Sequence, residues 1–235
     1  MQAVILAGGL GTRLRPVIGD LPKPLAPINE RPFLEYQIET LRAAGFDRFV
    51  LCVGYRHDLI ETHFADGRAL GVQIVYSVES QALGTGGALR LARPLLDETC
   101  LVLNGDTYFA ADFSQLVAQH TTPATLAMIS VPDAGRYGSL SVDGDGFITH
   151  FNEKGASGPG LINAGVYVLS SAAFRYMAEQ TPLSLETDVF PELARQRLLR
   201  GCALDGYHLD IGTPESYTRF ERDVRAGRLG RGVQV

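Results

Sequence analysis

The sequence has few cysteines, no long apolar run and no excess of basic residues, and each absence excludes a class of protein. Its cysteines, Cys52, Cys100 and Cys202, lie far apart and form no CxxC pair, so we expect buried free thiols, not disulfides or a metal site. No apolar run approaches the roughly 18 residues of a membrane span. The first residues show no basic-then-apolar leader, and we expect a cytoplasmic protein without a membrane partner.

Charge and length further restrict the classes of protein to which the chain could belong. Acidic residues outnumber basic ones by 26 to 21, which gives a formal net charge of −5. We therefore do not expect nucleic acid as a partner, although a local basic pocket remains open. Apolar residues form 46% of the chain and charged residues 20%, as in globular proteins. The 235 residues predict a single domain with two halves, about 1–131 and about 132–235.

The first half alternates short apolar runs with segments of helical spacing. The strand-like runs are residues 3–6, 49–53, 72–76 and 100–103, and the helical patterns are residues 33–44, 59–64 and 87–96. This repeat predicts an α/β fold, with a doubly wound, mostly parallel, Rossmann-like sheet and helices on both faces. In such sheets, ligands bind beyond the carboxyl ends of the strands.

The pattern changes after Pro132. Residues 139–148 predict two strands around an Asp/Gly turn, and residues 164–169 predict another strand. Helical patterns return at residues 172–178 and 186–195. We expect a smaller region with antiparallel strands, built onto the first sheet without a linker.

The segment LAGGLGTRLRP, residues 6–16, directly follows the first predicted strand. It is not a dinucleotide GxGxxG motif, because Leu14 stands where the third glycine would be. It is not a P-loop, because Arg13 stands where the second glycine would be. Glycines let backbone N–H groups approach phosphate oxygens, and Arg13 and Lys23 add positive charge. The alternative from the loop alone is a glycine-rich surface turn with unrelated basic residues.

Two acids follow strand-like runs. Asp106 ends the segment LNGD, and Asp210 lies in YHLDIGTP directly before a predicted helix. Two carboxylates that converge on phosphates suit Mg²⁺, which takes few carboxylates together with substrate phosphates and water. Each acid taken singly could instead form a turn or cap a helix. His208 lies near Asp210, and we do not include it among the site residues.

Seven motifs follow one another in an order that resembles a known family. They are GGxGTRL, PKP, LGTGG, NGD, EK, INAGVY and DIGTP, between about residues 1 and 220. As a set they are similar to the sugar-1-phosphate nucleotidyltransferases, whereas any single motif is weak. The resemblance implies a nucleotide-diphospho-sugar transferase fold, a nucleoside triphosphate and a sugar 1-phosphate as substrates, and Mg²⁺ as cofactor. The resemblance also makes a homo-oligomer possible for this chain.

The resemblance assigns roles to individual residues. Those implied to bind the nucleotide are Leu6, Ala7, Gly8, Gly9, Gly11, Thr12, Arg13, Lys23, Gln81, Gly84, Thr85, Gly86 and Asp106. Those implied to bind the sugar phosphate are Asn104, Gly138, Glu153, Lys154, Asn163 and Gly165. The implied catalytic residues are Arg13, Lys23, Asp106, Lys154 and Asp210, of which Asp106 and Asp210 would be the metal ligands. Within the nucleotide group, Gln81, Gly84, Thr85 and Gly86 would meet the base.

These roles fit the chemistry of the implied reaction. Both substrates are anions, so cationic side chains must offset their repulsion before they can react. The attacking phosphate is already ionised near neutral pH and needs no general base. Catalysis would therefore rest on positioning and electrostatic stabilisation.

The sequence departs from the family pattern at three places. Ala82 replaces a frequent proline before LGT, Gly155 replaces a frequent proline after EK, and Tyr207 takes the place of an aromatic residue that is often tryptophan, which this chain lacks. These departures affect the choice of base and sugar more than the chemistry.

Within the family, four runs are most similar to enzymes that use GTP and D-glycero-α-D-manno-heptose 1-phosphate. They are residues 20–27, 136–139, 161–167 and 184–191. Mannose 1-phosphate with GTP, and N-acetylmuramate 1-phosphate with UTP, are the alternative substrate pairs. A non-catalytic nucleotide-sugar-binding protein is an alternative of another class. A glycosyltransferase is disfavoured because NGD is not DxD, and an oxidoreductase because the third glycine is absent.

Overall fold

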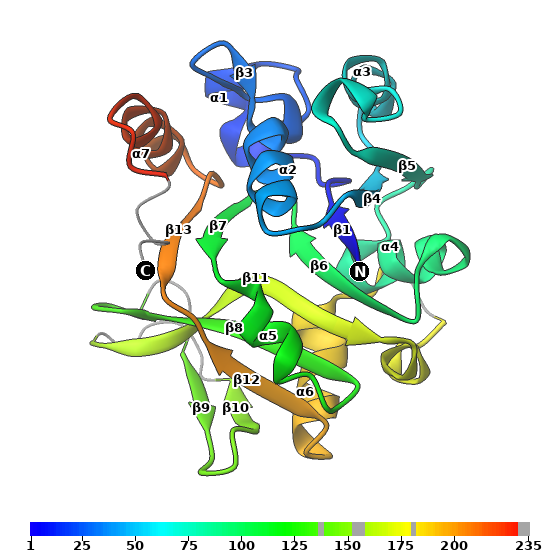
Figure 1. Cartoon of the computed structure of the whole chain (residues 1–235), viewed down its shortest axis with the longest axis vertical. Coiled ribbons are helices and arrows are strands. Elements are labelled where there is room, and N and C mark those ends of the chain that lie inside the picture. Colours follow the sequence, from blue (N-terminus) through cyan, green and yellow to red (C-terminus); the bar gives the residue numbers. More distant parts are fainter. Residues whose placement is uncertain (136–138, 152–157, 180–181, 230–235) are drawn as a thin grey trace.

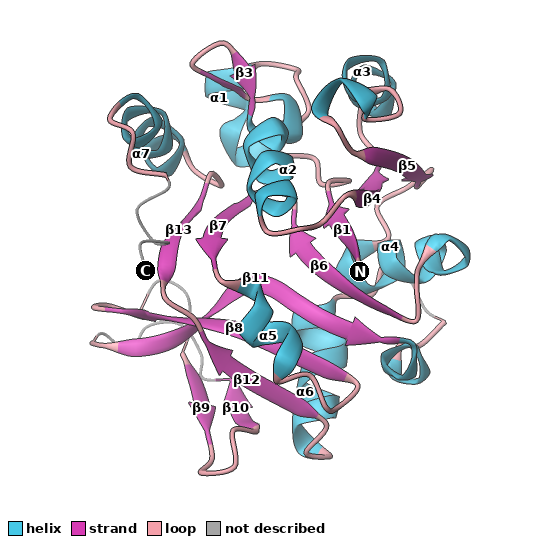
Figure 2. Cartoon of the chain, in the orientation of Figure 1, coloured by secondary structure: helices cyan, strands magenta, loops and turns pink. Residues whose placement is uncertain are grey.

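One large sheet forms the centre of the molecule (Figures 1 and 2). A computed structural model describes residues 1–135, 139–151, 158–179 and 182–229. The sheet has nine strands, in the order β10-β9-β11-β6-β1-β4-β5, with β8 paired to both β11 and β12. Its strands are β1 (Gln2–Leu6), β4 (Arg48–Val53), β5 (Gln73–Val78), β6 (Thr99–Asn104), β8 (Ala124–Val131), β9 (Leu140–Val142), β10 (Ile148–Phe151), β11 (Gly160–Ser170) and β12 (Leu199–Ala203).

Strands β1, β4, β5 and β6 of the first half are parallel, as predicted. Strand β1 lies between β4 and β6, with Leu6 opposite both Cys52 and Asn104. This register brings the carboxyl ends of three strands to one edge of the sheet. Strand β11 extends the same sheet by pairing antiparallel with β6. Strands β9, β10 and β12 lie at the opposite end of the molecule from α2 and α3 (Figure 1).

Helices cover both faces of the sheet. They are α1 (Arg15–Ile18), α2 (Phe33–Ala43), α3 (His57–Phe64), α4 (Gly84–Ala92), α5 (Phe113–Ala118), α6 (Phe190–Arg195) and α7 (Pro214–Arg225). Apolar side chains of α2, α3 and α5 share one buried cluster with Ile5 of β1, whereas those of α4 and α6 share another with Val4. This alternation follows from the two-residue period of a strand and confirms the predicted α/β architecture.

Two small sheets complete the fold: β2 (Pro27–Ile28) with β3 (Arg31–Pro32), and β7 (Thr107–Ala111) with β13 (Gly206–Asp210). Helix α7 follows β13 directly. Pro214 begins it, and Thr213 and Ser216 form a capping box. The buried ring of Phe220 in α7 packs edge-on against Phe33 of α2. The β7–β13 pair and α7 thereby fix where β13 ends beside the large sheet.

Three expected helices differ from those of the structure. The helix expected at 87–96 begins at Gly84 and ends at Ala92, and Arg93–Leu95 form a 3₁₀ turn, because Pro94 has no backbone N–H to donate. The helix expected at 172–178 is a 3₁₀ segment, Ser171–Tyr176. The helix expected at 186–195 is a π-helical turn, Leu185–Val189, followed by α6 with Pro191 near its start. The sequence analysis also missed β7, α5, β8 and β12.

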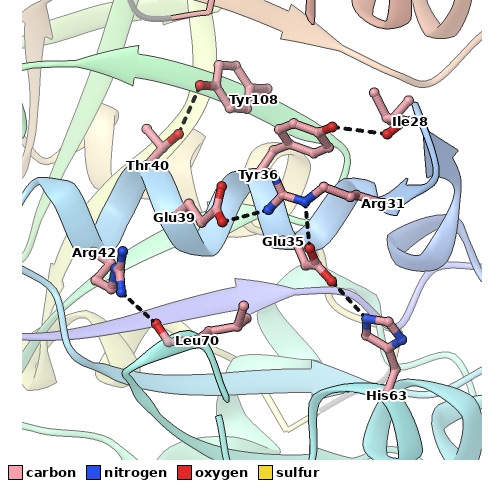
Figure 3. Close-up of polar contacts among 10 residues, drawn as sticks. All are labelled: Ile28, Arg31, Glu35, Tyr36, Glu39, Thr40, Arg42, His63, Leu70 and Tyr108. Atoms are coloured by element: carbon pink, nitrogen blue, oxygen red, sulfur yellow. Dashed lines mark hydrogen bonds and ion pairs between the residues drawn. The ribbon is translucent and has the colours of Figure 1, made fainter. Parts of the chain in front are cut away.

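Polar side chains tie α2 to its neighbours (Figure 3). Glu35 accepts a hydrogen bond from Arg31 at 2.9 Å and lies 2.9 Å from Nε2 of His63 in α3. Thr40 donates to the Tyr108 hydroxyl of β7 at 2.9 Å. The buried Gln37 amide donates to the carbonyls of residues 104 and 107, at 3.1 and 2.6 Å. Helix α2 therefore holds the turn that carries Asp106.

Two expectations from composition are also addressed by the structure. Cys52, Cys100 and Cys202 are buried free thiols, as predicted. Burial raises the pKa of the first two thiols to about 12, so they stay protonated at neutral pH. Among the described residues, no helix combines the length and apolarity needed to cross a membrane.

Candidate active site

A cavity of about 330 Å³ opens at the carboxyl ends of β1 and β6. Most of its lining comes from loops that follow strands, as expected for a parallel sheet. Of the residues predicted for the site, those that line it are Leu6, Ala7, Gly8, Gly9, Lys23, Gly84, Thr85, Asn104 and Asp106. Residues far apart in the sequence thus meet in one place.

The loop after β1 depends on close approach of its backbone to a neighbouring side chain. A Cβ atom at Gly8 would lie 2.4 Å from Oε1 of Glu79. Only glycine fits there without displacing the carboxylate. Gly11, Thr12 and Arg13 belong to the same loop but do not line the cavity.

Lys23 and Asp106 meet at the cavity. Nζ of Lys23 donates to Oδ2 of Asp106 at 2.8 Å. Lys23 lies in a 3₁₀ turn, Lys23–Leu25, between two prolines that restrict the local backbone. A cation and an acid are therefore held side by side where a phosphate-bearing ligand would enter.

Asp210 lies beside Asp106 through the pairing of β7 with β13. Asp210 is opposite Thr107, and the backbone N–H of Ile211 donates to the Asp106 carbonyl at 2.9 Å. Arg13 approaches the same point. A Cβ atom at Gly212 would lie 2.9 Å from an Asp210 oxygen and 3.3 Å from Nη2 of Arg13. The structure thus brings together both predicted metal ligands and one predicted phosphate-binding cation.

The donor set at this point suits Mg²⁺. Within the described part of the chain, no cluster of three or more His, Cys, Asp or Glu side chains is arranged to hold a metal ion. Asp106, in the turn between β6 and β7 at the cavity, and Asp210, at the end of β13, nevertheless match an ion that completes its shell with substrate phosphates and water. His208 packs edge-on against Phe109, with Nε2 3.2 Å from the Ala164 carbonyl. Burial lowers the pKa of His208, although the nearby carboxylates of Asp106 and Asp210 raise it in part.

The base side of the cavity contains a residue that the sequence analysis missed. Glu79 follows β5 and lines the cavity, and its Oε2 accepts the backbone N–H of Leu83 at 3.3 Å. Burial raises the pKa of Glu79 more than this hydrogen bond lowers it. Gln81 is exposed and does not line the cavity, and Gly86 is buried with its N–H bonded to the Leu183 carbonyl. The useful sequence signal was the position of Glu79 directly after a strand.

Three of the residues predicted to bind the sugar phosphate lie on β6 and β11, and of these only Asn104 lines the cavity. Asn104 ends β6, and Asn163 and Gly165 lie on β11 where its pairing with β8 shifts register. Nδ2 of Asn163 donates to the Tyr167 hydroxyl at 3.1 Å, and Nδ2 of Asn104 donates to it at 3.4 Å. Gly165 has a φ of 70°, and a Cβ atom there would lie 2.8 Å from Oγ1 of Thr107. Of the other predicted residues, Gly138, Glu153 and Lys154 lie outside the described part of the chain.

The fold and this site together define a class of protein: an α/β enzyme that binds a nucleotide at the carboxyl edge of a mostly parallel sheet. The family model for nucleotidyl transferases matches residues 2–227. The chain belongs to this family, which confirms the resemblance found in its motifs.

Individual relatives of the chain within this family are heptose 1-phosphate guanylyltransferases by name. A D-glycero-α-D-manno-heptose 1-phosphate guanylyltransferase from Campylobacter jejuni is 41% identical over 94% of this chain and 98% of its own length. One from Aneurinibacillus thermoaerophilus is 38% identical over 96% and 99%. The crystal structure of HddC from Yersinia pseudotuberculosis complexed with GMP-PN superimposes with a TM-score of 0.84 and 33% identity over 95% of this chain and 99% of that one.

Proposed function

We propose that this protein transfers GMP from GTP to D-glycero-α-D-manno-heptose 1-phosphate. An oxygen of the sugar phosphate attacks the α-phosphorus of GTP and forms a new P–O bond. The bond to the β-phosphate breaks, and pyrophosphate leaves with the electron pair. The products are GDP-heptose and pyrophosphate.

The observation that carries this proposal is the meeting of the loop after β1, Lys23 and Asp106 around one cavity, in a chain that shares nearly its full length with heptose 1-phosphate guanylyltransferases. Lys23 and Arg13 would offset the charge on the triphosphate. Lys154, on the family resemblance, would hold the sugar phosphate. Because both reactants are anions, fixed cations lower the cost of bringing them into line.

Asp106 and Asp210 would hold Mg²⁺. When bound, the ion would neutralise phosphate charge and help to align the reacting groups. The chain's own residues bind and orient the substrates. No side chain is required as a general base, because the attacking phosphate oxygen is ionised at neutral pH.

Glu79 supports the choice of GTP. An ionised carboxylate only accepts hydrogen bonds. Guanine offers two adjacent donors, the ring N1–H and the 2-amino group, whereas uracil offers one N–H between two carbonyl oxygens. Both oxygens of a carboxylate at this wall of the cavity could therefore accept hydrogen bonds from guanine. With uracil, one oxygen could accept from the N–H, and the other would face a carbonyl oxygen.

The test is pyrophosphate release with Mg²⁺, measured for four nucleoside triphosphates against the 1-phosphates of heptose, mannose, glucose and N-acetylmuramic acid. We expect release only with GTP and the heptose. Strong turnover with UTP and none with GTP would contradict the proposal. Release with GTP and mannose 1-phosphate alone would keep the guanylyl transfer and replace the sugar.

A further inference from the structure

A buried tyrosine hydroxyl joins the amides on the sugar-phosphate side of the cavity. Tyr167 has no exposed surface. Its oxygen accepts hydrogen bonds from Asn163 at 3.1 Å and Asn104 at 3.4 Å. Its proton is donated to Oε1 of Glu186 at 3.2 Å. The hydroxyl is thus fully used, as donor once and as acceptor twice.

Glu186 carries the network to the nucleotide side. It lies on the π-helical turn Leu185–Val189, and its Oε2 accepts the hydroxyl protons of Thr85 at 2.7 Å and Ser184 at 2.9 Å. Oγ1 of Thr85 in turn accepts the backbone N–H of Leu185 at 2.8 Å. Thr85 lines the cavity. A continuous path of hydrogen bonds therefore runs from the nucleotide side to both asparagines.

The backbone beside this path is held closely as well. The Leu183 carbonyl accepts the N–H groups of Gly86 and Gly87 at 2.9 and 3.2 Å. A Cβ atom at Gly84 would lie 2.4 Å from that carbonyl oxygen, and Gly84 has a φ of +77°. The start of α4 and the turn that carries Glu186 are therefore packed as one unit. Thr85 and Glu186 are thus linked both through their side chains and through the backbone around them.

Burial keeps the tyrosine in its donor form. The low-dielectric surroundings raise the pKa of Tyr167 well above its ordinary value, and the negative charge of Glu186 raises it further. The hydroxyl therefore keeps its proton at neutral pH. The path does not depend on titration of this group.

We propose that Tyr167 and Glu186 are positioning residues that couple the two substrate sites, so that a nucleotide seated against Thr85 orders the Asn104 and Asn163 amides for the sugar phosphate. This inference rests on the proposed function, because it assigns the two ends of the path to the two substrates. Neither residue lines the cavity, so neither is assigned a part in the chemical step. Their effect is on the affinity of one substrate in the presence of the other.

The test compares wild type with Tyr167→Phe, which removes the hydroxyl but keeps the ring that packs against Phe190 at a centroid distance of 4.8 Å. The affinity of a non-hydrolysable GTP analogue with Mg²⁺ is measured by calorimetry, with and without sugar 1-phosphate. In the variant, we expect the affinity for the nucleotide alone to stay within about twofold. We expect the KM for the sugar 1-phosphate to rise about tenfold, as for one lost hydrogen bond to a polar group, and the sugar phosphate to lose its effect on nucleotide affinity.

Two further variants separate coupling from a merely structural effect. Tyr108→Phe removes another buried hydroxyl, bonded to Thr40 at 2.9 Å, and should leave the KM values and the coupling unchanged. Glu186→Gln keeps the size of the side chain but can no longer accept from both Tyr167 and Thr85, and it should reproduce the rise in the sugar-phosphate KM. Melting temperatures show which variants are folded. If Tyr167→Phe does not fold, the same KM and affinity measurements on Glu186→Gln decide the question.

Several outcomes would overturn the inference. One is a folded Tyr167→Phe variant with unchanged sugar-phosphate KM and unchanged coupling. Another is an equal loss of affinity for each substrate measured alone. Absence of coupling in the wild type would overturn it too. The proposed function fails separately: if the wild type releases pyrophosphate with another substrate pair, coupling is measured with that pair.

Discussion

The two sides of the cavity are built in different ways. On the side proposed for the nucleotide, loops after parallel strands and the start of α4 supply much of the lining, and a Cβ atom at Gly8 would displace the Glu79 carboxylate. On the side proposed for the sugar phosphate, amide side chains of β6 and β11 are held by the buried Tyr167 hydroxyl. The first arrangement follows mainly from the order of the parallel strands. The second depends on contacts between residues distant in the sequence, so substitutions on the two sides should affect different kinetic constants.

The largest effect should come from Asp106→Asn, at the boundary between the two sides. The change removes one of the two carboxylates placed for Mg²⁺ and weakens the pairing with Lys23, so transition-state charge is less well offset. We expect kcat to fall by about 10²-fold or more, with the melting temperature close to that of wild type. Steady-state pyrophosphate release and thermal unfolding measure the two quantities.

Asp112→Asn is the matched control. Asp112 caps α5, with its Oδ1 accepting the Ser114 N–H at 3.0 Å, and asparagine caps a helix about as well. Its kcat should match wild type. Unchanged turnover in Asp106→Asn would remove Asp106 from the set of metal ligands.

A second substitution tests the base side alone. Glu79→Gln replaces an acceptor oxygen with an amide donor, which fits a carbonyl of uracil and opposes a donor of guanine. We expect the ratio of kcat/KM for GTP to that for UTP to fall about 10²-fold, because a buried donor left unpaired is costly. The sugar-phosphate KM should change little. Both ratios come from steady-state kinetics with each nucleotide at saturating sugar 1-phosphate.

Gln81→Ala is the control for this experiment. The exposed Gln81 is one of the four base-binding residues implied by family resemblance, whereas Glu79 lines the cavity. If Gln81→Ala changed the base preference and Glu79→Gln did not, the base would be read by Gln81 and our assignment of Glu79 would be wrong.

Elements predicted from the sequence share a simple property. Strands β1, β4 and β6 are short apolar runs next to turn residues, and their ends come within a residue or two of the prediction. Strand β8 (Ala124–Val131) was missed because Ala124, Ala127 and Met128 are residues that favour helices over strands. The π-helical turn at Leu185–Val189 could not be predicted, since a five-residue hydrogen-bond spacing leaves no helical period of its own.

The site was predictable to a similar extent. Asp106 follows a recognisable strand, and the position of Asp210 before a predicted helix was also visible. Glu79 was missed because its approach to Gly8 depends on the registers that place β5 beside β4 and β4 beside β1. The Tyr167 network combines residues from four separate segments and has no local pattern. Long-range register, more than local propensity, is what the sequence did not reveal.

A third substitution compares the lysines expected to bind the two substrates. Lys154→Ala should raise the KM for the sugar 1-phosphate about tenfold, the loss expected for one charge-assisted hydrogen bond, and leave the GTP KM near wild type. Lys23→Ala is its counterpart and should raise the KM for GTP instead, because Lys23 lies at the cavity beside Asp106. Initial rates with one substrate varied at a time give both constants. A rise in GTP KM alone for Lys154→Ala would show that the pocket is divided differently.

The smallest effect concerns a contact away from the cavity lining. Helices α2 and α3 are joined by the partly exposed pairing of Glu35 with Arg31 and His63, whereas the Tyr167 network near the cavity is buried. Burial alone would raise the pKa of Glu35, but hydrogen bonds and charges from His63 and Arg31 outweigh it, and the pKa is lowered from 4.5. A lowered pKa stabilises the folded state above pH 4.5, and this contribution is lost as the pH falls through the folded value. Glu35→Gln should therefore cost less than about 1 kcal/mol at pH 7, and the difference from wild type should shrink in acid.

Urea unfolding at a series of pH values measures this difference. Glu61→Gln is the matched control, because the ion pair of Glu61 is with His57 of the same helix, at 3.0 Å. Its unfolding free energy should stay close to that of wild type at every pH, and added salt should weaken the Glu35 contribution as it screens exposed charges. A Glu35→Gln deficit that stayed constant from pH 7 into acid would mean that Glu35 stabilises α2 through packing and neutral hydrogen bonds.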